Sequence, residues 1–320
     1  MADTKGDAAS RFDPTFTQNV INAMGPNTSP RMREIMGPLI QHLHDFAREV
    51  ELTVDEWMEG VQLINRAGQM SDDKRNEGQL VCDVIGLESL VDEITYKKAA
   101  EASDFATQSA ILGPFFREDH PIRKKGESII YNTPDDGEAR STNLSCPYAA
   151  TDRSPGYLHV RAGTGRRIQE AVEECLYEQQ DDNQQDSNLR GKFYTDENGE
   201  YAFYCLRPTP YPVPFDGPAG KLLQLMDRHP YRPAHIHLIA LGDGYKPITT
   251  QIFDKESKYL DNDSVFAVKD SLTVEFVPRK GNDSMARSEL QYDILMAPMN
   301  SDVASGPEGG LTTNGLMTKL

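Results

Sequence analysis

The spacing of apolar residues changes near residue 110, and this change constrains the fold more than any other feature of the chain. Upstream, apolar side chains recur at steps of three and four residues, which places them along one side of a helix. Downstream, prolines, glycines and alternation with a period of two are typical of strands. We therefore predict an α-helical N-terminal domain at residues 1–110, a mainly β-sandwich domain at residues 111–298, and a loose polar tail at residues 299–320.

Three apolar patterns make up the helical part. Residues 36–50 form one stripe, and a second helix is predicted after Thr53, where the spacing to Glu56 matches a capping box. Residues 80–94 predict a further helix or a kinked pair of helices. Three such helices enclose their own apolar surface poorly. We expect them to pack on the second domain or on a second subunit.

Strand signals dominate the second part of the chain. Residues 191–206 predict a hairpin, with Asp196-Glu197-Asn198-Gly199 as the turn between two runs rich in aromatic residues. Further strands are predicted at residues 235–241, 249–253 and 271–277, the last with Leu272, Val274 and Phe276 on one face.

Composition excludes several classes of protein. A net charge of −17 argues against binding to nucleic acid or to an anionic membrane, because phosphates would be repelled. The N-terminus lacks a signal-type apolar segment, and no window is apolar for long enough to cross a bilayer, so we expect a cytoplasmic protein. The four cysteines are too irregularly spaced for a disulfide framework or a zinc knuckle. They are Cys82, Cys146, Cys175 and Cys205.

A histidine pair carries the clearest chemical signal. His235 and His237 are one residue apart on a predicted strand, so both imidazoles face the same side. Alone, such a pair is more often two half-buried polar side chains on a sheet face than a metal site. However, Arg232 precedes it by three residues, and a Tyr-Pro-Val-Pro turn places Tyr211 upstream. A phenolate oxygen combined with imidazole nitrogens suits ferric iron better than magnesium or a thiolate-binding metal.

With these residues in place, the chain resembles the intradiol ring-cleavage dioxygenases, the family of catechol 1,2-dioxygenase and hydroxyquinol 1,2-dioxygenase. The resemblance spans about residues 31–279. Its motifs are LIQHLHDFAREVELTVDEW, ILGPFF, LYEQQ, RGKFYTDENGEY, YPVPFDGPAG, DRHPYRPAHIH and TTQIFD.

The resemblance implies a catalytic β-sandwich that holds Fe(III) through Tyr177, Tyr211, His235 and His237, and N-terminal helices that form a homodimer. It implies that the enzyme inserts both atoms of O2 into a small aromatic diol, catechol or hydroxyquinol. The product is a cis,cis-muconate-type or maleylacetate-type diacid.

The same resemblance assigns roles around the metal. Tyr211 leaves the iron when the diol binds and accepts a proton, Arg232 stabilises negative charge on the substrate, and Gln251 is a polar neighbour of the substrate. A further set is implied to line the ring pocket: Leu80, Ile111, Gly113, Pro114, Phe266 and Ala267. From the residues alone, Arg232 also reads as an ordinary carboxylate partner, Gln251 as a sheet-edge hydrogen bonder, and the pocket set as plain core.

One segment departs from the family pattern. Residues 137–175 lack clean alternation, and Ile168 lies only nine residues before Tyr177, which is too short for the expected strand and loop. An alternative hypothesis is therefore an inactive iron- or diol-binding homologue, or a site in which Tyr148 or Tyr157 replaces the first tyrosine. A third reading, a zinc hydrolase built on the histidine pair, lacks a convincing carboxylate ligand and general base.

Overall fold

The computed structural model describes residues 13–72, 75–100, 106–114, 121–131, 141–146, 157–162, 187–196, 199–242, 245–280 and 286–298. The predicted tail at residues 299–320 lies outside these ranges. The chain divides into two compact units, residues 1–63 and residues 64–320. A domain boundary at residue 110 remains a prediction.

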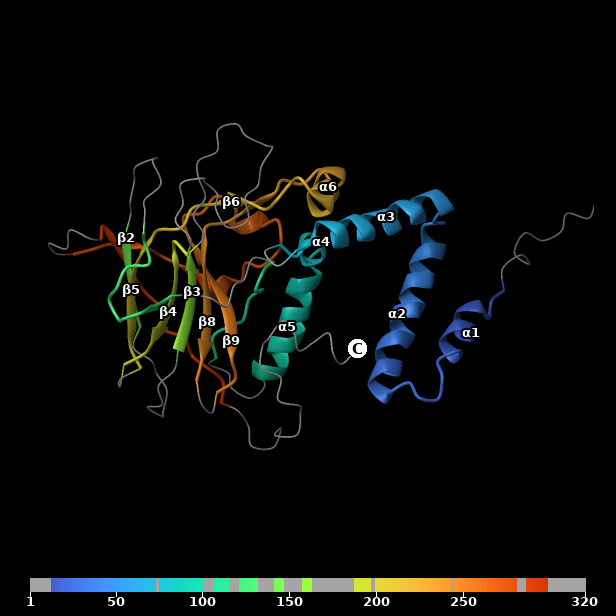
Figure 1. Ribbon diagram of the computed structural model, residues 1–320, viewed down its shortest axis with the longest axis horizontal. Coiled ribbons are helices and arrows are strands. Elements are labelled where there is room, and N and C mark those ends of the chain that lie inside the picture. The colour runs from blue at the N-terminus through green and yellow to red at the C-terminus, as the bar shows by residue number, and fades with distance from the viewer. Residues whose placement is uncertain are drawn as a thin grey trace, which may run out of the picture. The chain divides into compact units, whose positions relative to one another are not determined.

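The first unit contains α1 (Phe16–Asn22) and α2 (Pro30–Glu49) (Figure 1). Helix α2 begins six residues before the predicted stripe, because Ser29 caps it by accepting the backbone N–H of Met32 at 3.2 Å. Pro30 occupies the first helical position, where its missing N–H costs nothing. The apolar stripe of α2 remains about half exposed at Leu39, Leu43 and Phe46.

Helix α3 (Val54–Met70) opens with the predicted capping box. The Thr53 backbone N–H donates to Glu56 Oε2 at 2.9 Å, and the Glu56 N–H donates to Thr53 Oγ1 at 3.3 Å, which confirms the prediction. Within the described ranges, no helix has the length and apolar character that a membrane span needs.

The predicted third helical pattern is a kinked pair, α4 (Glu77–Val84) and α5 (Leu87–Ala100). Gly86 separates the two helices with a φ of +76°, a conformation that a side chain would strain. A short helix, α6 (Pro218–Leu225), follows later in the chain.

The described strands form two sheets and a short two-stranded ribbon (Figure 1). The six-stranded sheet has the order β1 (Ile122–Arg123), β4 (Arg190–Tyr194), β3 (Tyr157–Ala162), β8 (His235–Leu241), β9 (Ile248–Asp254) and β10 (Thr273–Val274). The four-stranded sheet has the order β11 (Val277–Pro278), β12 (Ser288–Gln291), β2 (Ser141–Cys146) and β5 (Tyr201–Leu206). The ribbon pairs β6 (Tyr211–Pro212) with β7 (Tyr231–Arg232). Two single 3-10 turns lie at Leu260–Asn262 and Asp270–Leu272.

The segment that departs from the family pattern contributes two central strands. Strand β3 pairs antiparallel with both β4 and β8, and β2 lies between β12 and β5. The segment thus supplies pairing partners to both sheets even though it lacks clean alternation. Backbone hydrogen bonds do not require alternating side chains, so a polar segment can complete a sheet between two well-patterned neighbours.

The predicted hairpin at residues 191–206 is corrected. The central turn residues Glu197 and Asn198 lie outside the described residues; the Gly199 N–H donates to the Asp196 carbonyl at 2.9 Å, but β4 and β5 belong to different sheets. Phe193 and Phe203 are fully buried, and their rings stack with centroids 5.1 Å apart. The two strands thus bring their inward aromatic rings face to face instead of lying side by side.

A single apolar cluster includes buried side chains from both sheets, among them Phe193, Phe203, Ile236, Leu238 and Leu290. The predicted strand at residues 271–277 is split: β10 joins the six-stranded sheet and β11 joins the four-stranded sheet. Its alternation survives this break, because the predicted inward face is buried throughout. Those side chains are Leu272, Val274 and Phe276.

We predict that Phe203→Ala lowers the free energy of unfolding by about 3–5 kcal/mol, because it removes a ring that both sheets bury. Urea titration followed by circular dichroism measures the change. Tyr194→Ala, at a half-exposed position of β4, is the matched control and should cost about 1 kcal/mol or less. Equal losses in the two variants would contradict this account of the core.

Candidate metal and ring-binding site

Strand β8 brings the two predicted histidines together. His235 and His237 are both buried, and their Nε2 atoms lie 3.2 Å apart. His235 Nδ1 lies 2.7 Å from the Pro233 carbonyl oxygen, which can only accept a hydrogen bond. Nδ1 therefore carries the proton, and Nε2 presents a lone pair toward His237. A backbone carbonyl that fixes the tautomer in this way is typical of metal-binding histidines.

The ribbon of β6 and β7 adds the phenol. Tyr211 pairs with Arg232 across this ribbon, and the Val213 N–H bonds to the Pro230 carbonyl at 2.9 Å. The Tyr211 Oη lies 3.4 Å from His235 Nε2, and the side chain is buried. Two imidazole nitrogens and one phenol oxygen thus converge on a common point.

These donors fit a transition metal. Two nitrogens that bind one ion at about 2.1 Å and near a right angle lie about 3 Å apart, close to the observed separation. Within the described part of the chain, no group of three or more His, Cys, Asp or Glu side chains is arranged for a metal. The predicted set instead depends on phenols. Tyr177 and Tyr148 lie outside the described residues, and only the backbone of Tyr157 is described.

Arg232 is held in a fully buried position beside the donors. Its Nε and Nη2 atoms lie 3.1 and 3.2 Å from the two oxygens of Asp263, and Nη1 lies 3.2 Å from His235 Nε2. Burial lowers the pKa of Arg232, but Asp263 and then Tyr211 outweigh this effect and raise it. The arginine is a fixed cation that faces the convergence point.

Gln251 lies opposite His237 in the register of β9 and β8 and is fully buried. Its Oε1 accepts Arg232 Nη2 at 2.8 Å, and its Nε2 donates to the Ile111 carbonyl at 2.6 Å. Gln251 therefore orients Arg232 and anchors the ILGP segment, which is more than a sheet-edge role requires.

A small enclosed pocket adjoins the donors. It is lined by Leu80, Asp83, Ile111, Gly113, Pro114, Tyr211, Val213, Arg232, His237 and Val265. Gly113 has a φ of +76°, and a Cβ there would lie 3.9 Å from His237 Cε1. The backbone of the ILGP segment therefore passes directly over the histidine.

Asp83 is the exceptional residue of this pocket. It is fully buried, no N–H group among the described residues donates to its carboxylate oxygens, and its hydrogen-bonding neighbour is the Glu88 carboxylate. Burial, and then the neighbouring Glu88 carboxylate, raise the pKa of Asp83 to about 10, against the opposing charge of Arg232. At neutral pH the pocket therefore contains a protonated carboxylic acid, which can both donate and accept a hydrogen bond.

Known proteins are similar to this sequence over most of its length. The family model described as "Catechol dioxygenase N terminus" matches residues 29–103, and the one described as "Dioxygenase" matches residues 162–298. The chain is 48% identical to an intradiol ring-cleavage dioxygenase of Aspergillus niger, over 90% of this chain and 89% of that protein. The chain belongs to the intradiol ring-cleavage dioxygenase family.

A catechol 1,2-dioxygenase of Candida albicans is 46% identical to this intradiol dioxygenase, over 89% of this chain and 93% of that protein. A solved hydroxyquinol 1,2-dioxygenase of Pseudomonas putida matches with a TM-score of 0.74 and 31% identity, over 89% of this chain and 98% of that chain. The helical N-terminal region and the dioxygenase activity are thus properties of the family to which the chain belongs.

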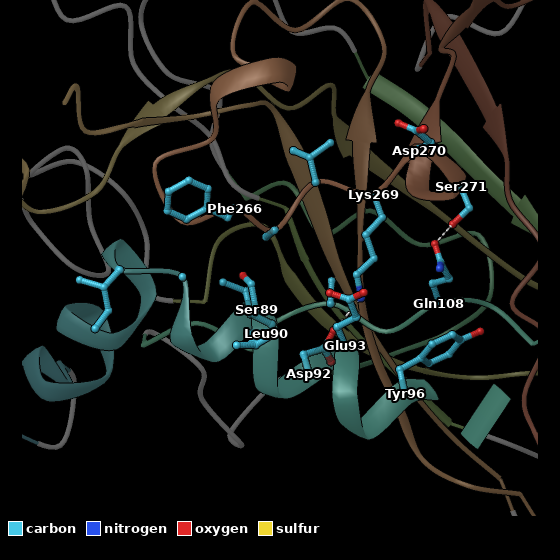
Figure 2. Close-up of a pocket in the computed structure, with 16 residues that line it drawn as sticks. Ser89, Leu90, Asp92, Glu93, Tyr96, Gln108, Phe266, Lys269, Asp270 and Ser271 are labelled. Atoms are coloured by element: carbon cyan, nitrogen blue, oxygen red, sulfur yellow. Dashed lines mark hydrogen bonds and ion pairs between the residues drawn. The ribbon is translucent and has the colours of Figure 1, made fainter. Parts of the chain in front are cut away.

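The predicted ring-pocket residues of this dioxygenase separate into two groups. Four of them line the enclosed pocket, as stated above. Phe266 and Ala267 instead line a larger hollow beside α5, which Figure 2 shows with Phe266 at one side and Lys269 across it. Phe266 has a φ of +60° and is 54% exposed, and its ring lies under the Arg228 guanidinium, 4.4 Å from the centroid. Only Ile111 borders both spaces.

Two carboxylates of the site, and the apolar lining residues Val213 and Val265, were not predicted. Asp263 holds Arg232, and Asp83 enters the ring pocket from α4. No sequence signal marks Asp263, which stands in a polar loop. Asp83 interrupts an apolar helical pattern, LVCDVI, and a buried carboxylate at such a position is the kind of exception that marks a functional site.

We predict that Asp83→Asn removes a pH-dependent loss of stability in chelator-treated protein. Between about pH 4 and about pH 10 the folded state retains the Asp83 proton while the unfolded chain loses it, so this group destabilises the fold increasingly as pH rises. The stability difference between variant and wild type should widen by about 1 kcal/mol or more from pH 4.5 to pH 7.

Urea titrations at both pH values measure this difference. Asp261→Asn, at an exposed carboxylate, is the control, and its difference from wild type should stay constant. A constant difference for Asp83→Asn would contradict the protonated state of Asp83.

Proposed function

We propose that this intradiol dioxygenase binds Fe(III) and uses O2 to cleave a small aromatic diol between its hydroxyl-bearing carbons. The observation that carries the proposal is the convergence of Tyr211 Oη with the Nε2 atoms of His235 and His237 beside a buried arginine. Tyr177 is proposed as the fourth donor. The relatives named for catechol and hydroxyquinol support a ring with two adjacent hydroxyls.

Ferric iron, when bound, would be chelated by the diol and would activate the ring toward O2. The remaining work belongs to the chain. Tyr211 would help to hold the iron, and its Oη is proposed to accept one of the diol protons, because it is the one donor of the three that is not on the central strand. Its short ribbon allows the phenol to turn away while the histidines stay fixed by β8.

Arg232 is proposed to stabilise negative charge on the substrate. Asp263 and Gln251 occupy its Nε and Nη2, so Nη1 is the group that faces the donors. A cation that is already oriented and buried needs no reorganisation during the reaction. Gln251 fixes this direction and thereby acts on the substrate through the arginine.

Asp83 favours hydroxyquinol over catechol. Both hydroxyls of catechol would be used by the metal, which leaves a catechol ring with no partner for the buried acid. A third ring hydroxyl can bond to Asp83, and one such hydrogen bond adds about 0.5–1.5 kcal/mol. We therefore propose a trihydroxylated ring as the preferred substrate, with a maleylacetate-type product, and catechol as the poorer one.

Other features belong to the same proposal. The shared apolar cluster of the two sheets supports a β-sandwich, and the open apolar stripe of α2 supports a homodimer through the N-terminal helices. A cytoplasmic location is proposed from the sequence. The pairing of β2 and β3 in both sheets supports an active enzyme over the alternative of an inactive homologue.

We predict that Tyr211→Phe lowers kcat for hydroxyquinol at least about 100-fold, because it removes the proton acceptor at Oη. Oxygen uptake and the absorbance of the ring-opened diacid measure turnover. The visible absorption of the iron-loaded protein, typical of ferric phenolate, should also weaken. Wild type that remains colourless with iron and leaves both catechol and hydroxyquinol intact would refute the proposed function.

We predict that Asp83→Leu lowers the ratio of kcat/KM for hydroxyquinol to that for catechol about 10-fold, because one hydrogen bond to the third hydroxyl is lost. Asp83→Asn should lower the ratio less, since an amide still bonds to a hydroxyl. Cys82→Ala changes the neighbouring α4 position and should leave the ratio unchanged. A ratio that is the same in all variants would show that Asp83 does not select the substrate.

A further inference from the structure

We infer that Arg75 and Glu77 are positioning residues that set the place of Tyr211 at the metal, through a buried ion pair that clamps the segment after it. This inference rests on the proposed function. It concerns residues that lie outside both the donor set and the ring pocket.

The ion pair is almost completely buried. The side chains of Arg75 and Glu77 are 2% and 0% exposed, and Arg75 Nη2 lies 2.6 Å from Glu77 Oε2. The guanidinium also reaches both oxygens of Asp216, at 3.1 and 3.0 Å. Arg75 is therefore a planar fork between two carboxylates, one on α4 and one in the segment that follows Tyr211.

Glu77 makes a second connection. Its Oε1 accepts the backbone N–H of Ala219, in the first turn of α6, at 3.0 Å. One carboxylate thus neutralises Arg75 and also caps a helix in a distant part of the sequence. The segment 213–217, with the start of α6, is held against the start of α4.

Two glycines show how tightly this segment lies on the pair. A Cβ at Gly217 would overlap Glu77 Oε1 and would also meet Met70 Sδ at 2.7 Å and Arg75 Nη2 at 2.8 Å. A Cβ at Gly220 would overlap the backbone of Phe215. Without side chains at these two positions, the backbone rests directly on the charged groups and on α6.

The clamp joins two walls of the ring pocket. Helix α4 carries Glu77 at its start and Leu80 one turn later, and Leu80 lines the pocket. The clamped segment begins at Val213, another lining residue, only two positions after Tyr211. The ion pair therefore sets the distance between α4 and the segment that follows Tyr211.

A buried ion pair is weak evidence of a role in stability, because apolar side chains of similar volume often replace it without loss. It does impose one geometry, since a bidentate fork has a single well-aligned arrangement. For a tyrosine that must alternate between binding the metal and leaving it, a fixed backbone confines the motion to the side chain. This cluster therefore fixes the position of the segment after Tyr211 more than it adds to stability.

The test is the double variant Arg75→Met/Glu77→Met, which keeps the volume and removes both charges of the buried pair, while Asp216 stays partly exposed to water. The visible ferric-phenolate absorption per bound iron should fall at least about twofold, and kcat should fall about 10-fold or more with a smaller change in KM. In metal-free protein, amide exchange of residues 213–219 should become faster. Arg75→Lys keeps the charge but loses the fork, and should fall between wild type and the double variant.

Lys269→Met is the matched control, because it removes a partly buried ion pair with Asp92 that does not touch the Tyr211 segment. Its absorption and kcat should match wild type, even where it loses as much thermal stability as the double variant. If the double variant does not fold, Asp216→Asn tests the same clamp from its more exposed side and should move the readouts in the same direction.

Double-variant or Asp216→Asn protein with wild-type absorption, kcat and amide exchange would overturn the inference while the proposed function stands. Wild type without the absorption and without turnover would instead refute the proposed function.

Discussion

The two Nε2 atoms of His235 and His237 lie 3.2 Å apart in a buried place, and the rest of the site depends on this contact. The Pro233 carbonyl fixes the His235 proton on Nδ1, so a lone pair faces the second imidazole. Two lone pairs at that distance repel each other unless a proton or a cation lies between them. The pairing of β8 with β9 and of β6 with β7 then places Gln251, Arg232 and Tyr211 around the same point.

Charge around this point is arranged in opposed pairs. Arg232 is balanced by Asp263 and kept ionised, whereas Asp83 has no such partner and is kept neutral by burial. The fixed cation is suited to a substrate that becomes anionic at two oxygens. The protonated acid in the same small pocket is suited to a third oxygen that stays neutral. Outside the residues that line the pocket, Arg75 bonds to two carboxylates, those of Glu77 and Asp216.

Local patterns predicted the elements that local forces determine. The capping box at Thr53, the kinked helix pair and the strand His235–Leu241 follow from hydrogen bonds and periodicities within a few residues. The hairpin at residues 191–206 failed because its turn is local but its pairing is not. Phe193 stacks on Phe203 from the opposite sheet, and no local pattern records that choice. The pairing of the segment at residues 137–175 is non-local in the same way.

The sequence by itself determined which donors exist and that the two imidazoles share a face, because a strand alternates with a period of two. The sequence also showed the family resemblance in the motifs that contain the metal donors and the ILGP segment. Only the tertiary structure decided that Asp263 orients Arg232, that Asp83 is buried beside Glu88, and that Phe266 borders a different hollow. Burial and charge pairing are properties of residues far apart in the chain, so they exist only once the chain has folded.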